Sequence, residues 1–577
     1  MSHSSPSPVE GIKSRSRHLR GTIAEGLEDA VTGALREDDT HLVKFHGIYQ
    51  QDDRDVRAER RAQRLEPAYQ FMVRARIPGG ICTAAQWLAM DAIACTWANH
   101  TLRITTRQTF QFHGILKRNL KSSIAAINQA LLDTLAACGD VNRNVVGTTL
   151  AFPPAIRAQV AAVCRDLSDR LLPRTRAYHE IWLDGAQVVN TADDAEPLYG
   201  ETYLPRKFKI GVAVPPDNDI DVFAQDLGFI AIVDRDKLLG FNVTVGGGLG
   251  MTHGEFATYP RLGDVLGFCR SEQALRVAEA VITVQRDLGD RTDRRHARLK
   301  YTIDTLGLAH FRAEVESRLG ESLEPARPFR FAHNGDHPGW REEADGTAHC
   351  TVHLASGRVQ DDGDRRALSG LRAIAAEALA TFHLTANQNV VLADIAPARR
   401  ARVAQLLAEH GIDETAATPT RARALACVGL PTCGLAMAES ERYLETFVSR
   451  LESLQRQYGL SEVPVTLRIT GCPNGCARPF LAEVALVGKA PGRYNLHLGG
   501  AFDGTRLNAP YAESLDEDAI LATLAPLLEN YARGRNDNER FGDFLVRTGV
   551  VPALTVGREF AAAARALAER RSFGDVP

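Results

Sequence analysis

Ten cysteines occur in the chain, and four of them form two closely spaced pairs. Cys427 and Cys433 are separated by five residues, and Cys472 and Cys476 by three. Four thiolates supplied by two loops are the usual ligands of a [4Fe–4S] cluster. Structural zinc usually takes cysteines separated by two to four residues, so the longer gap fits zinc poorly. The spacing therefore favours an iron–sulfur cluster, and a zinc site or disulfides remain as alternatives.

The residues beside the second pair predict a loop that approaches a bulky group closely. Gly471, Pro473 and Gly475 turn the chain and leave little side-chain bulk around Cys472. Glycine lets the backbone come near an inorganic group and direct N–H donors at its sulfur atoms. A helix is expected over residues 436–454, after the first pair.

Residues 102–113 alternate between apolar and polar side chains, which predicts one continuous strand. Most apolar groups would lie on one face. The other face would carry side chains suited to an anion, namely Arg103, Arg107, Gln111 and His113. A polar face that simply meets water is the alternative. Lys, Glu or Thr would serve equally well there, so the recurrence of Arg and His indicates an anion site without excluding a solvated face.

A second cationic strand is expected over residues 203–214, where Arg206, Lys207 and Lys209 lie close together. The alternation Lys-Phe-Lys would place both lysines on the same face. Further along, residues 246–250 end a strand in a glycine-rich loop. No helix follows this loop and no acidic residue stands at the required distance, so it is not a dinucleotide-binding loop. We interpret it as backbone that lies close to something flat or bulky.

The chain contains an internal repeat. Residues 382–395 reproduce the pattern of residues 102–115 in the same register, and residues 463–472 reproduce that of residues 204–213. We therefore predict a tandem duplication of the form A–B–A′–B′. The first B unit carries Arg143, Lys207 and Lys209, whereas the second carries the four cysteines. If the halves pack about a pseudo-twofold axis, the cations and the cluster meet at one central site.

Composition excludes several classes of protein. The chain has 577 residues with a net charge of −3, so it has no overall attraction for nucleic acid. No apolar run approaches the length of about 18 residues that a membrane helix needs. The first twenty residues are polar and lack the apolar core of a secretory signal. We expect a cytoplasmic protein, which suits reduced thiols, with no nucleic-acid or membrane partner.

Four long motifs together resemble the sirohaem–[4Fe–4S] sulfite and nitrite reductase family, and most narrowly its NADPH-dependent assimilatory branch. The resemblance runs from residue 19 to residue 544. It is carried by residues 106–114 (TRQTFQFHG), residues 204–209 (LPRKFK), the two cysteine pairs and residues 488–500 (GKAPGRYNLHLGG). Where the family pattern has proline after the second cysteine, this chain has Gly434.

The resemblance implies a fold, two cofactors and a set of site residues. The fold would be α+β, with ferredoxin-like half-domains and two larger α/β domains that hold the cofactors. The implied domains are an N-terminal arm at 1–65, half-domains at 66–140 and 336–420, a first sirohaem and substrate domain at 141–335, and a cluster domain at 421–577. The implied cofactors are sirohaem, an iron tetrahydroporphyrin with eight carboxylates, and a [4Fe–4S] cluster.

Residue by residue, the resemblance implies that Cys427, Cys433, Cys472 and Cys476 hold the cluster and that Cys476 also bridges to the haem iron. Sulfite would lie among Arg74, Arg143, Lys207 and Lys209. The sirohaem and its carboxylates would be lined by Arg103, Arg107, Gln111, His113, Arg206 and Asn474. Several cations are needed, because each one about 4 Å from an anion returns roughly 4 kcal/mol at an effective dielectric constant near 20. The two lysines are the candidate proton donors.

The implied reaction is the six-electron reduction of sulfite to sulfide in assimilatory sulfate reduction and cysteine biosynthesis. The chain has no Gly-x-Gly-x-x-Gly opening a βαβ unit, so an NADPH-oxidising flavoprotein subunit is the expected electron donor, in a hetero-oligomer. Residues 50–61 are strongly charged and suit either a docking element or a solvated face. One alternative is a ferredoxin-dependent sulfite or nitrite reductase. Another is a non-catalytic iron–sulfur or zinc scaffold.

Overall fold

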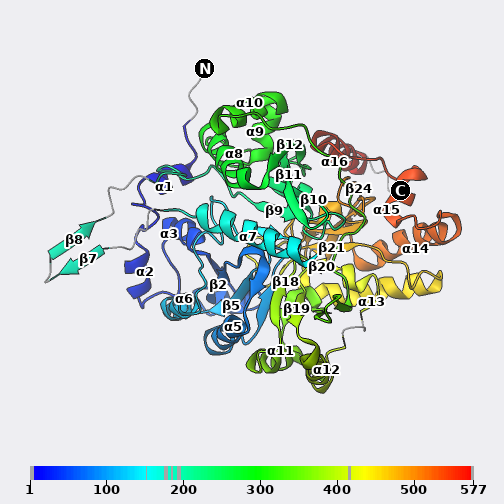
Figure 1. Ribbon diagram of the computed structural model, residues 1–577, viewed down its shortest axis with the longest axis horizontal. Helices are drawn as coiled ribbons and strands as arrows, with labels where there is room; N and C mark the ends of the chain where they lie inside the picture. Colours follow the sequence, from blue (N-terminus) through cyan, green and yellow to red (C-terminus); the bar gives the residue numbers. More distant parts are fainter. Residues whose placement is uncertain are drawn as a thin grey trace.

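The computed structural model of the chain describes residues 5–150, 153–174, 180–183, 186–190, 196–413 and 417–572. Within these residues, each half of the chain contributes two five-stranded sheets, and helices pack against them (Figure 1). The predicted α+β class is confirmed. No helix in the described part is both long and apolar enough to cross a membrane.

Two of the sheets, which we call the half-domain sheets, have the same construction. The first has the order β1 (Ile48–Asp52), β2 (Tyr69–Ala75), β5 (Phe110–Ile115), β4 (Leu102–Ile104) and β15 (Arg358–Val359). The second has the order β13 (Gly339–Glu342), β14 (Ala348–Val352), β19 (Val390–Ile395), β18 (Thr381–Leu384) and β3 (Ile81–Cys82). The internal repeat seen in the sequence is therefore a repeat of structure.

The two half-domain sheets exchange their last strands. Strand β15 belongs to the second half of the chain but pairs with β4, and β3 belongs to the first half but pairs with β18. Helix α5 (Ala84–Trp97) packs against α11 (Ala367–Ala376) beneath them. The fully buried Trp87 of α5 stacks on Phe382 of β18, with ring centroids 4.5 Å apart. The half-domains therefore share one core.

The single strand expected over residues 102–113 is wrong. The segment forms a hairpin, in which β4 and β5 pair so that Arg103 lies opposite Gln111. The turn between them closes through the Thr105 N–H, which donates to the Thr109 carbonyl at 3.0 Å, and Gln108 takes a positive φ of 52°. Gln388 takes the same conformation, with φ of 68°, in the equivalent turn between β18 and β19.

The other two sheets, which we call the large sheets, also match each other. The first has the order β6 (Val146–Gly147), β9 (Ile210–Ala213), β10 (Leu227–Asp234), β11 (Lys237–Val245) and β12 (Asp264–Arg270). The second has the order β20 (Leu425–Ala426), β21 (Leu467–Thr470), β22 (Val484–Ala490), β23 (Arg493–Leu498) and β24 (Ala509–Leu515). In both sheets, the first three strands pair in parallel, the fourth strand pairs antiparallel with the third, and the fifth pairs antiparallel with the fourth.

Helices cover the large sheets and close the molecule. The helix expected over residues 436–454 begins later, at Glu441, because residues 433–440 are used for the turns around the first cysteine pair. The strand expected over residues 203–214 is confined to β9, so Lys207 and Lys209 precede the strand. The main helices are α6 (Leu120–Gln129), α7 (Pro154–Arg170), α8 (Ala274–Leu288), α9 (Leu299–Leu306), α10 (Leu308–Leu319), α12 (Arg400–Glu409), α13 (Glu441–Gln457), α14 (Glu517–Gly534), α15 (Phe541–Arg547) and α16 (Gly557–Ser572).

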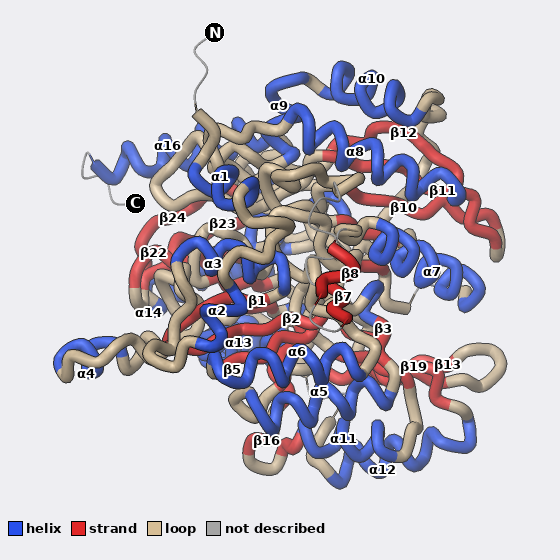
Figure 2. The backbone as a smooth tube through the Cα atoms, turned by 90° about the vertical axis from the view of Figure 1, so that its left-hand side faces the viewer, coloured by secondary structure: helices blue, strands red, loops and turns tan. Residues whose placement is uncertain are grey.

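Much of the predicted N-terminal arm is built into the fold. Strand β1 pairs with β2, and α1 (Pro8–Ser14) is anchored by Lys13, whose Nζ donates to the Leu204 carbonyl at 2.9 Å. Helix α4 (Arg57–Ala62), in contrast, has no buried residue and projects from the molecule (Figure 2). The domain boundaries stay predictions, but residues 48–52 belong with the first half-domain sheet because they extend it.

The two large sheets meet through residues in equivalent positions. Asp221 and Arg478 each precede a short 3-10 helix, η4 (Val222–Ala224) and η9 (Pro479–Leu481), and both adopt the left-handed conformation. They pair with each other, with 2.6 Å between Asp221 Oδ2 and Arg478 Nε. Such a contact between equivalent residues is what packing about a pseudo-twofold axis produces.

Candidate active site

The structure brings the four paired cysteines together. Cys427 directly follows β20, and Cys472 and Cys476 follow the neighbouring parallel strand β21. Each of the buried thiols of Cys433 and Cys472 is within electrostatic reach of both Cys427 and Cys476. The thiol of Cys476 is the exposed one of the four. Two loops on adjacent strands therefore supply one set of four sulfur atoms.

The surroundings of these thiols suit a bound inorganic cluster. The backbone N–H of Gly471 donates to Cys427 Sγ at 3.2 Å, and Asn474 Nδ2 donates to Cys472 Sγ at 3.4 Å. Burial and then the neighbouring thiols raise the pKa of Cys433 to about 11 and that of Cys472 to about 12. Four such groups become thiolates together only around a cationic centre.

The alternatives from the sequence are less well supported by this arrangement. None of the ten cysteines, all within the described residues, forms a disulfide. A single zinc ion needs four ligand atoms about 2.3 Å from one point. Within the described ranges, no three His, Cys, Asp or Glu side chains are grouped tightly enough for a single ion.

Cationic side chains line a cavity beside Cys476. Five of the predicted site residues meet on its wall: Arg107, Lys207, Lys209, Asn474 and Cys476. Lys207 and Lys209 flank Phe208, which forms a parallel bridge with Asn142, and both lysines line the cavity. The two lysines therefore lie together without the regular strand that the sequence suggested.

Burial and the neighbouring positive charges both disfavour the protonated form of the two lysines in this cavity. Burial, followed by the charges of Arg206 and Arg143, lowers the pKa of Lys207 to about 7. Burial, then Lys207 and Arg107, lowers the pKa of Lys209 well below its ordinary value. A cavity with this excess of fixed positive charge has a strong affinity for anions.

Arg74 and Arg143 complete the cationic field from the first half of the chain. Arg143 donates through Nε and one terminal nitrogen to the Gly139 carbonyl, each at 3.2 Å. Arg74 donates to Cys138 Sγ at 3.2 Å. The charges of both arginines contribute to lowering the pKa of Arg107 to about 9, behind the larger effect of burial. Of the four residues predicted around sulfite, Lys207 and Lys209 line the cavity, whereas Arg74 and Arg143 are not among its lining residues and reach Arg107 through their charges.

The residues predicted to line the sirohaem are placed by the hairpin. Arg103 bonds to Gln111 at 3.3 Å and to Glu441 at 3.0 Å. Both ring nitrogens of His113 are buried and have no hydrogen-bond partner in the part of the chain that the structure describes. Burial, then Arg358 and Arg103, lowers the pKa of His113 well below its ordinary value. Arg206 lies 3.9 Å from Asp140 and is one-third exposed.

Several residues of the site were missed from the sequence. Arg298 lines the cavity and makes a buried bidentate pair with Asp226, at 2.7 Å to each oxygen. Arg478 lines the cavity as well. Tyr49 of β1 is hydrogen-bonded to Arg143. Arg478 could have been noticed because it stands two residues after Cys476. Arg298 and Tyr49 belong to no motif and gave no signal.

The side chains present therefore fit the two cofactors that the sequence implied. The donor set suits a [4Fe–4S] cluster, and the unpartnered buried His113 and the surplus of arginine suit a ligand rich in carboxylates. Glycines allow the close approach that a large flat ligand requires: a Cβ on Gly250 would lie 3.2 Å from the Asn474 carbonyl oxygen.

Comparison with known proteins gives consistent results. The family "Nitrite and sulphite reductase 4Fe-4S domain" matches residues 165–323, and the family "Nitrite/Sulfite reductase ferredoxin-like half domain" matches residues 63–130 and 341–410. The NADPH sulfite reductase hemoprotein beta-component of Myxococcus xanthus is 60% identical over 96% of this chain and 99% of its own length. The corresponding protein of Anoxybacillus flavithermus is 55% identical over 96% and 98%.

A solved structure shows the same fold. The structure of Mycobacterium tuberculosis NirA protein superposes with a TM-score of 0.74 at 24% identity, and the match covers 95% of this chain and 97% of that chain. On the evidence of the full-length relatives and both family matches, the chain belongs to the nitrite and sulfite reductase family, among the hemoprotein beta-components of NADPH sulfite reductase.

Proposed function

We propose that this chain reduces sulfite to sulfide with six electrons, as the haemoprotein component of an NADPH-dependent sulfite reductase in cysteine biosynthesis. The observation that carries the proposal is the meeting of two features at one cavity. Cys476 of the four-cysteine set lines the cavity, and cationic side chains of the first half of the chain line it as well.

In this proposal, Cys427, Cys433, Cys472 and Cys476 hold the cluster, and Cys476 also ligates the haem iron. Cys476 suits this second role because its thiol is exposed to the cavity, whereas Cys472 is buried. Arg103, Arg107, Gln111, His113, Arg206 and Asn474 would contact the sirohaem and its carboxylates. When bound, the coupled cofactors supply the electrons and the iron atom on which sulfur is reduced.

The chain's own residues bind the anion and supply protons. Arg74 and Arg143 orient sulfite through charge-assisted hydrogen bonds, since guanidinium groups present several donors in a fixed plane. Removal of three oxygen atoms as water consumes protons. Lys207 and Lys209 are proposed to deliver them, because their ammonium groups lie in the cavity beside the other cations. A lysine whose pKa lies near 7 releases a proton readily at neutral pH.

The electron donor is proposed to be a flavoprotein subunit that oxidises NADPH. Docking near the first cysteine pair is supported by the loop before α4, where Arg54 donates to the carbonyls of Cys433 at 3.3 Å and Ala436 at 2.5 Å. Helix α4 beyond it is exposed and rich in arginine. A cytoplasmic location is part of the proposal, because ten cysteines that form no disulfide suit a reducing compartment.

Anaerobic purification of the intact protein tests the proposal. We expect a chlorin-like absorption spectrum, iron and sulfide in the ratio of one cluster plus one haem, and no zinc. Turnover of sulfite with a flavoprotein reductase should exceed turnover with ferredoxin, and should exceed turnover of nitrite. Zinc without haem would refute the catalytic role. Activity with ferredoxin alone would refute the proposed partner and leave the reaction standing.

The variant Cys476→Ser tests the bridge. It should lose six-electron reduction because the haem is uncoupled from the cluster. Cys269→Ser is the matched control, since Cys269 is a buried thiol of β12 that lies outside the site. Equal loss in both variants would show that the effect of Cys476→Ser is a general one on folding.

A further inference from the structure

Lys300 of α9 is a completely buried lysine outside the cationic cavity. Its Nζ donates to three backbone carbonyls, those of Gly248 at 3.1 Å, Gly250 at 2.9 Å, and Tyr259. A neutral amine has only two N–H groups, whereas an ammonium group has three, so three acceptors match the charged form. The face of the Tyr301 ring, with its centroid 4.7 Å from Nζ, adds a further contact that favours a cation.

Burial opposes this charge. It lowers the pKa of Lys300 well below the ordinary value, and the nearby Arg298 charge adds to the effect. The carbonyl oxygens oppose that trend, since they replace the water that the ammonium group loses. Backbone carbonyl oxygens from both ends of residues 248–259 therefore surround the Lys300 ammonium group.

The loop that Lys300 holds lies directly against the loop carrying Cys472 and Cys476. The Met251 N–H donates to the Pro473 carbonyl at 2.9 Å. A Cβ on Gly250 would lie 3.2 Å from the Asn474 carbonyl oxygen, and a Cβ on Gly475 would lie 3.4 Å from the Leu249 carbonyl oxygen. Residues 249–251 thus touch each of the three residues between the two cysteines.

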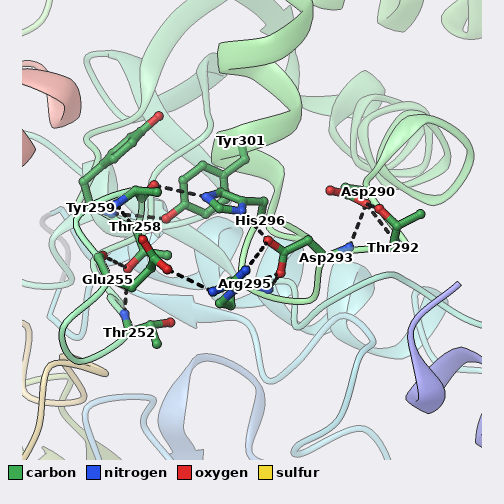
Figure 3. A network of polar contacts seen from close by, with 11 residues as sticks. Thr252, Glu255, Thr258, Tyr259, Asp290, Thr292, Asp293, Arg295, His296 and Tyr301 are labelled. Atoms are coloured by element: carbon green, nitrogen blue, oxygen red, sulfur yellow. Dashed lines mark hydrogen bonds and ion pairs between the residues drawn. The ribbon is translucent and has the colours of Figure 1, made fainter. Parts of the chain in front are cut away.

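A second network holds the outer side of the same loop (Figure 3). Arg295 bonds to Glu255 at 2.9 Å, His296 contacts the Ala257 carbonyl at 3.1 Å, and the Tyr259 N–H donates to Tyr301 Oη at 3.2 Å. The Arg295–Glu255 pair is partly exposed, with Arg295 about half accessible. Such surface pairs contribute little to stability. The inner contact through Lys300 is buried, and together with the backbone bridge between Gly248 and Arg261 it holds the start of the loop.

We propose that Lys300 is a positioning residue, whose buried ammonium group fixes residues 248–251 against the Cys472–Cys476 loop and so sets the position of the Cys476 thiolate. The inference rests on the proposed function for the role of Cys476, but its structural part does not depend on any cofactor. Removing the ammonium group leaves the carbonyls of Gly250 and Tyr259 without this donor, whereas the Gly248 carbonyl still accepts from the Arg261 N–H at 3.0 Å, so the backbone at residues 250 and 259 must open to water or rearrange.

The first test uses Lys300→Met in the full-length chain and measures hydrogen exchange of backbone amides without cofactors. The Met251 amide should exchange about tenfold faster or more, because its acceptor at Pro473 is no longer held in place. Glu255→Gln is the matched control, since it removes an outer contact of the same loop, and it should leave the Met251 amide protected. Unchanged protection in Lys300→Met, or equal loss in Glu255→Gln, would overturn the inference.

The second test uses Gly250→Ala, which keeps Lys300 and disturbs the same contact from the opposite side. The added methyl group would press on the Asn474 carbonyl oxygen. In cofactor-loaded protein, both Gly250→Ala and Lys300→Met should alter the electron paramagnetic resonance spectrum of the reduced protein and its midpoint potential, whereas Glu255→Gln should not. Native spectra in both variants would refute the positioning role. Absence of any haem or cluster in the unaltered protein would refute the proposed function, while the exchange experiment would still decide the role of Lys300.

Discussion

Lys207 is a buried ammonium group whose nearest charged neighbours, Arg206 and Arg143, are also positive. Such a group raises the free energy of the empty protein, and a bound anion offsets this by supplying the missing negative charge. We expect Lys207→Met to lower sulfite turnover by about 100-fold or more, the range found when a general acid is removed. The haem absorption spectrum should persist, because the variant keeps the four cysteines.

The measurement is steady-state reduction of sulfite with an artificial electron donor, combined with the absorption spectrum. Lys237→Met is a suitable control, since Lys237 is exposed at the start of β11. Full activity in Lys207→Met would exclude the proposed proton donor at this position. Loss of the haem spectrum would instead assign Lys207 to cofactor binding.

Asp219 shows what the first half of the chain has at the position of Cys476. It lies two residues before Asp221, as Cys476 lies two residues before Arg478. It accepts hydrogen bonds from Thr148 Oγ1 at 2.8 Å and from the Thr149 N–H at 3.0 Å. Thr148 follows β6 as Cys427 follows β20. A hydrogen-bonded acid and hydroxyl thus stand where the second half has two cluster ligands.

The buried Asp219 predicts a pH-dependent stability. Burial, and then Asp217 and Asp336, raise the pKa of Asp219 to about 7. Between pH 4 and pH 7 the unfolded chain releases this proton while the folded chain keeps it, so stability falls as the pH rises. The free energy of unfolding of Asp219→Asn, relative to that of the unaltered protein, should therefore rise through this window by on the order of 1.4 kcal/mol per pH unit, as measured by urea unfolding at each pH. A difference that is constant from pH 4 to pH 8 would contradict it.

At the scale of elements, the two hairpin turns act as clamps on the large sheets. The Gln108 side chain makes two bonds of 2.9 Å to the backbone of Gly147, the last residue of β6. The Gln388 side chain bonds in the same way to Ala426, the last residue of β20, at 2.9 and 3.3 Å. Only the second clamp is adjacent to a cluster ligand, Cys427.

This symmetry provides an internal control. Gln108→Ala leaves the buried N–H and carbonyl of Gly147 without partners, whereas Gln388→Ala leaves only the Ala426 N–H, because Arg103 also donates to the Ala426 carbonyl at 3.0 Å. Each group without a partner should cost about 1–3 kcal/mol of stability. Only Gln388→Ala should also lower the iron content, because β20 leads directly into Cys427. Denaturant unfolding and iron analysis measure the two effects. Equal iron content in both variants would show that the clamp does not position the cysteine.

The sequence predicted some of these elements and not others, for physical reasons. The repeat was visible because Gln108 and Gln388 fall in the same register of two similar segments. The turn inside the first segment was missed, because residues 105–109 contain no glycine, proline or asparagine and the alternation of side chains continues through them. The exchanged strands β3 and β15 have two residues each, which is too short for any periodicity to show.

The predicted site residues that the structure brings together are mostly those that stand close together in sequence. The cysteine pairs and the Arg206–Lys209 segment could be recognised because their spacing alone limits the chemistry. Arg298 and Asp226 meet only after folding, so neither position carried a signal by itself. Tyr49 was missed because a charged N-terminal segment gave no reason to expect a strand that reaches Arg143.

At the scale of the whole molecule, the two halves are joined by buried charge. Asp221 lies 2.7 Å from Arg468 and 2.6 Å from Arg478, and all three side chains are buried. Although burial opposes it, these two arginines hold the pKa of Asp221 below its ordinary value. One carboxylate of the first half therefore neutralises two guanidinium groups of the second.

Asp221→Asn should destabilise the molecule by about 3–5 kcal/mol, because it leaves two buried arginines without a counter-charge. Equilibrium unfolding in urea measures the loss. Asp518→Asn is the control, since Asp518 pairs with Arg450 on the surface and its removal should produce no measurable change. A stability equal to that of the unaltered protein would show that Arg468 and Arg478 find other partners. Asp219→Asn and Asp221→Asn lie two residues apart, yet the first should gain stability relative to the unaltered protein as the pH rises and the second should lose it.

The crossed pairing of β3 with β18 and of β15 with β4 has a consequence for biosynthesis. While the ribosome is still translating, β4 keeps an unpaired edge until Val359 has emerged, although most of its own sheet is already made. Neither half can complete its sheet alone, so the edge of β4 stays unpaired from residue 104 to residue 359, which is nearly half of synthesis, and in that time it is open to contact with chaperones.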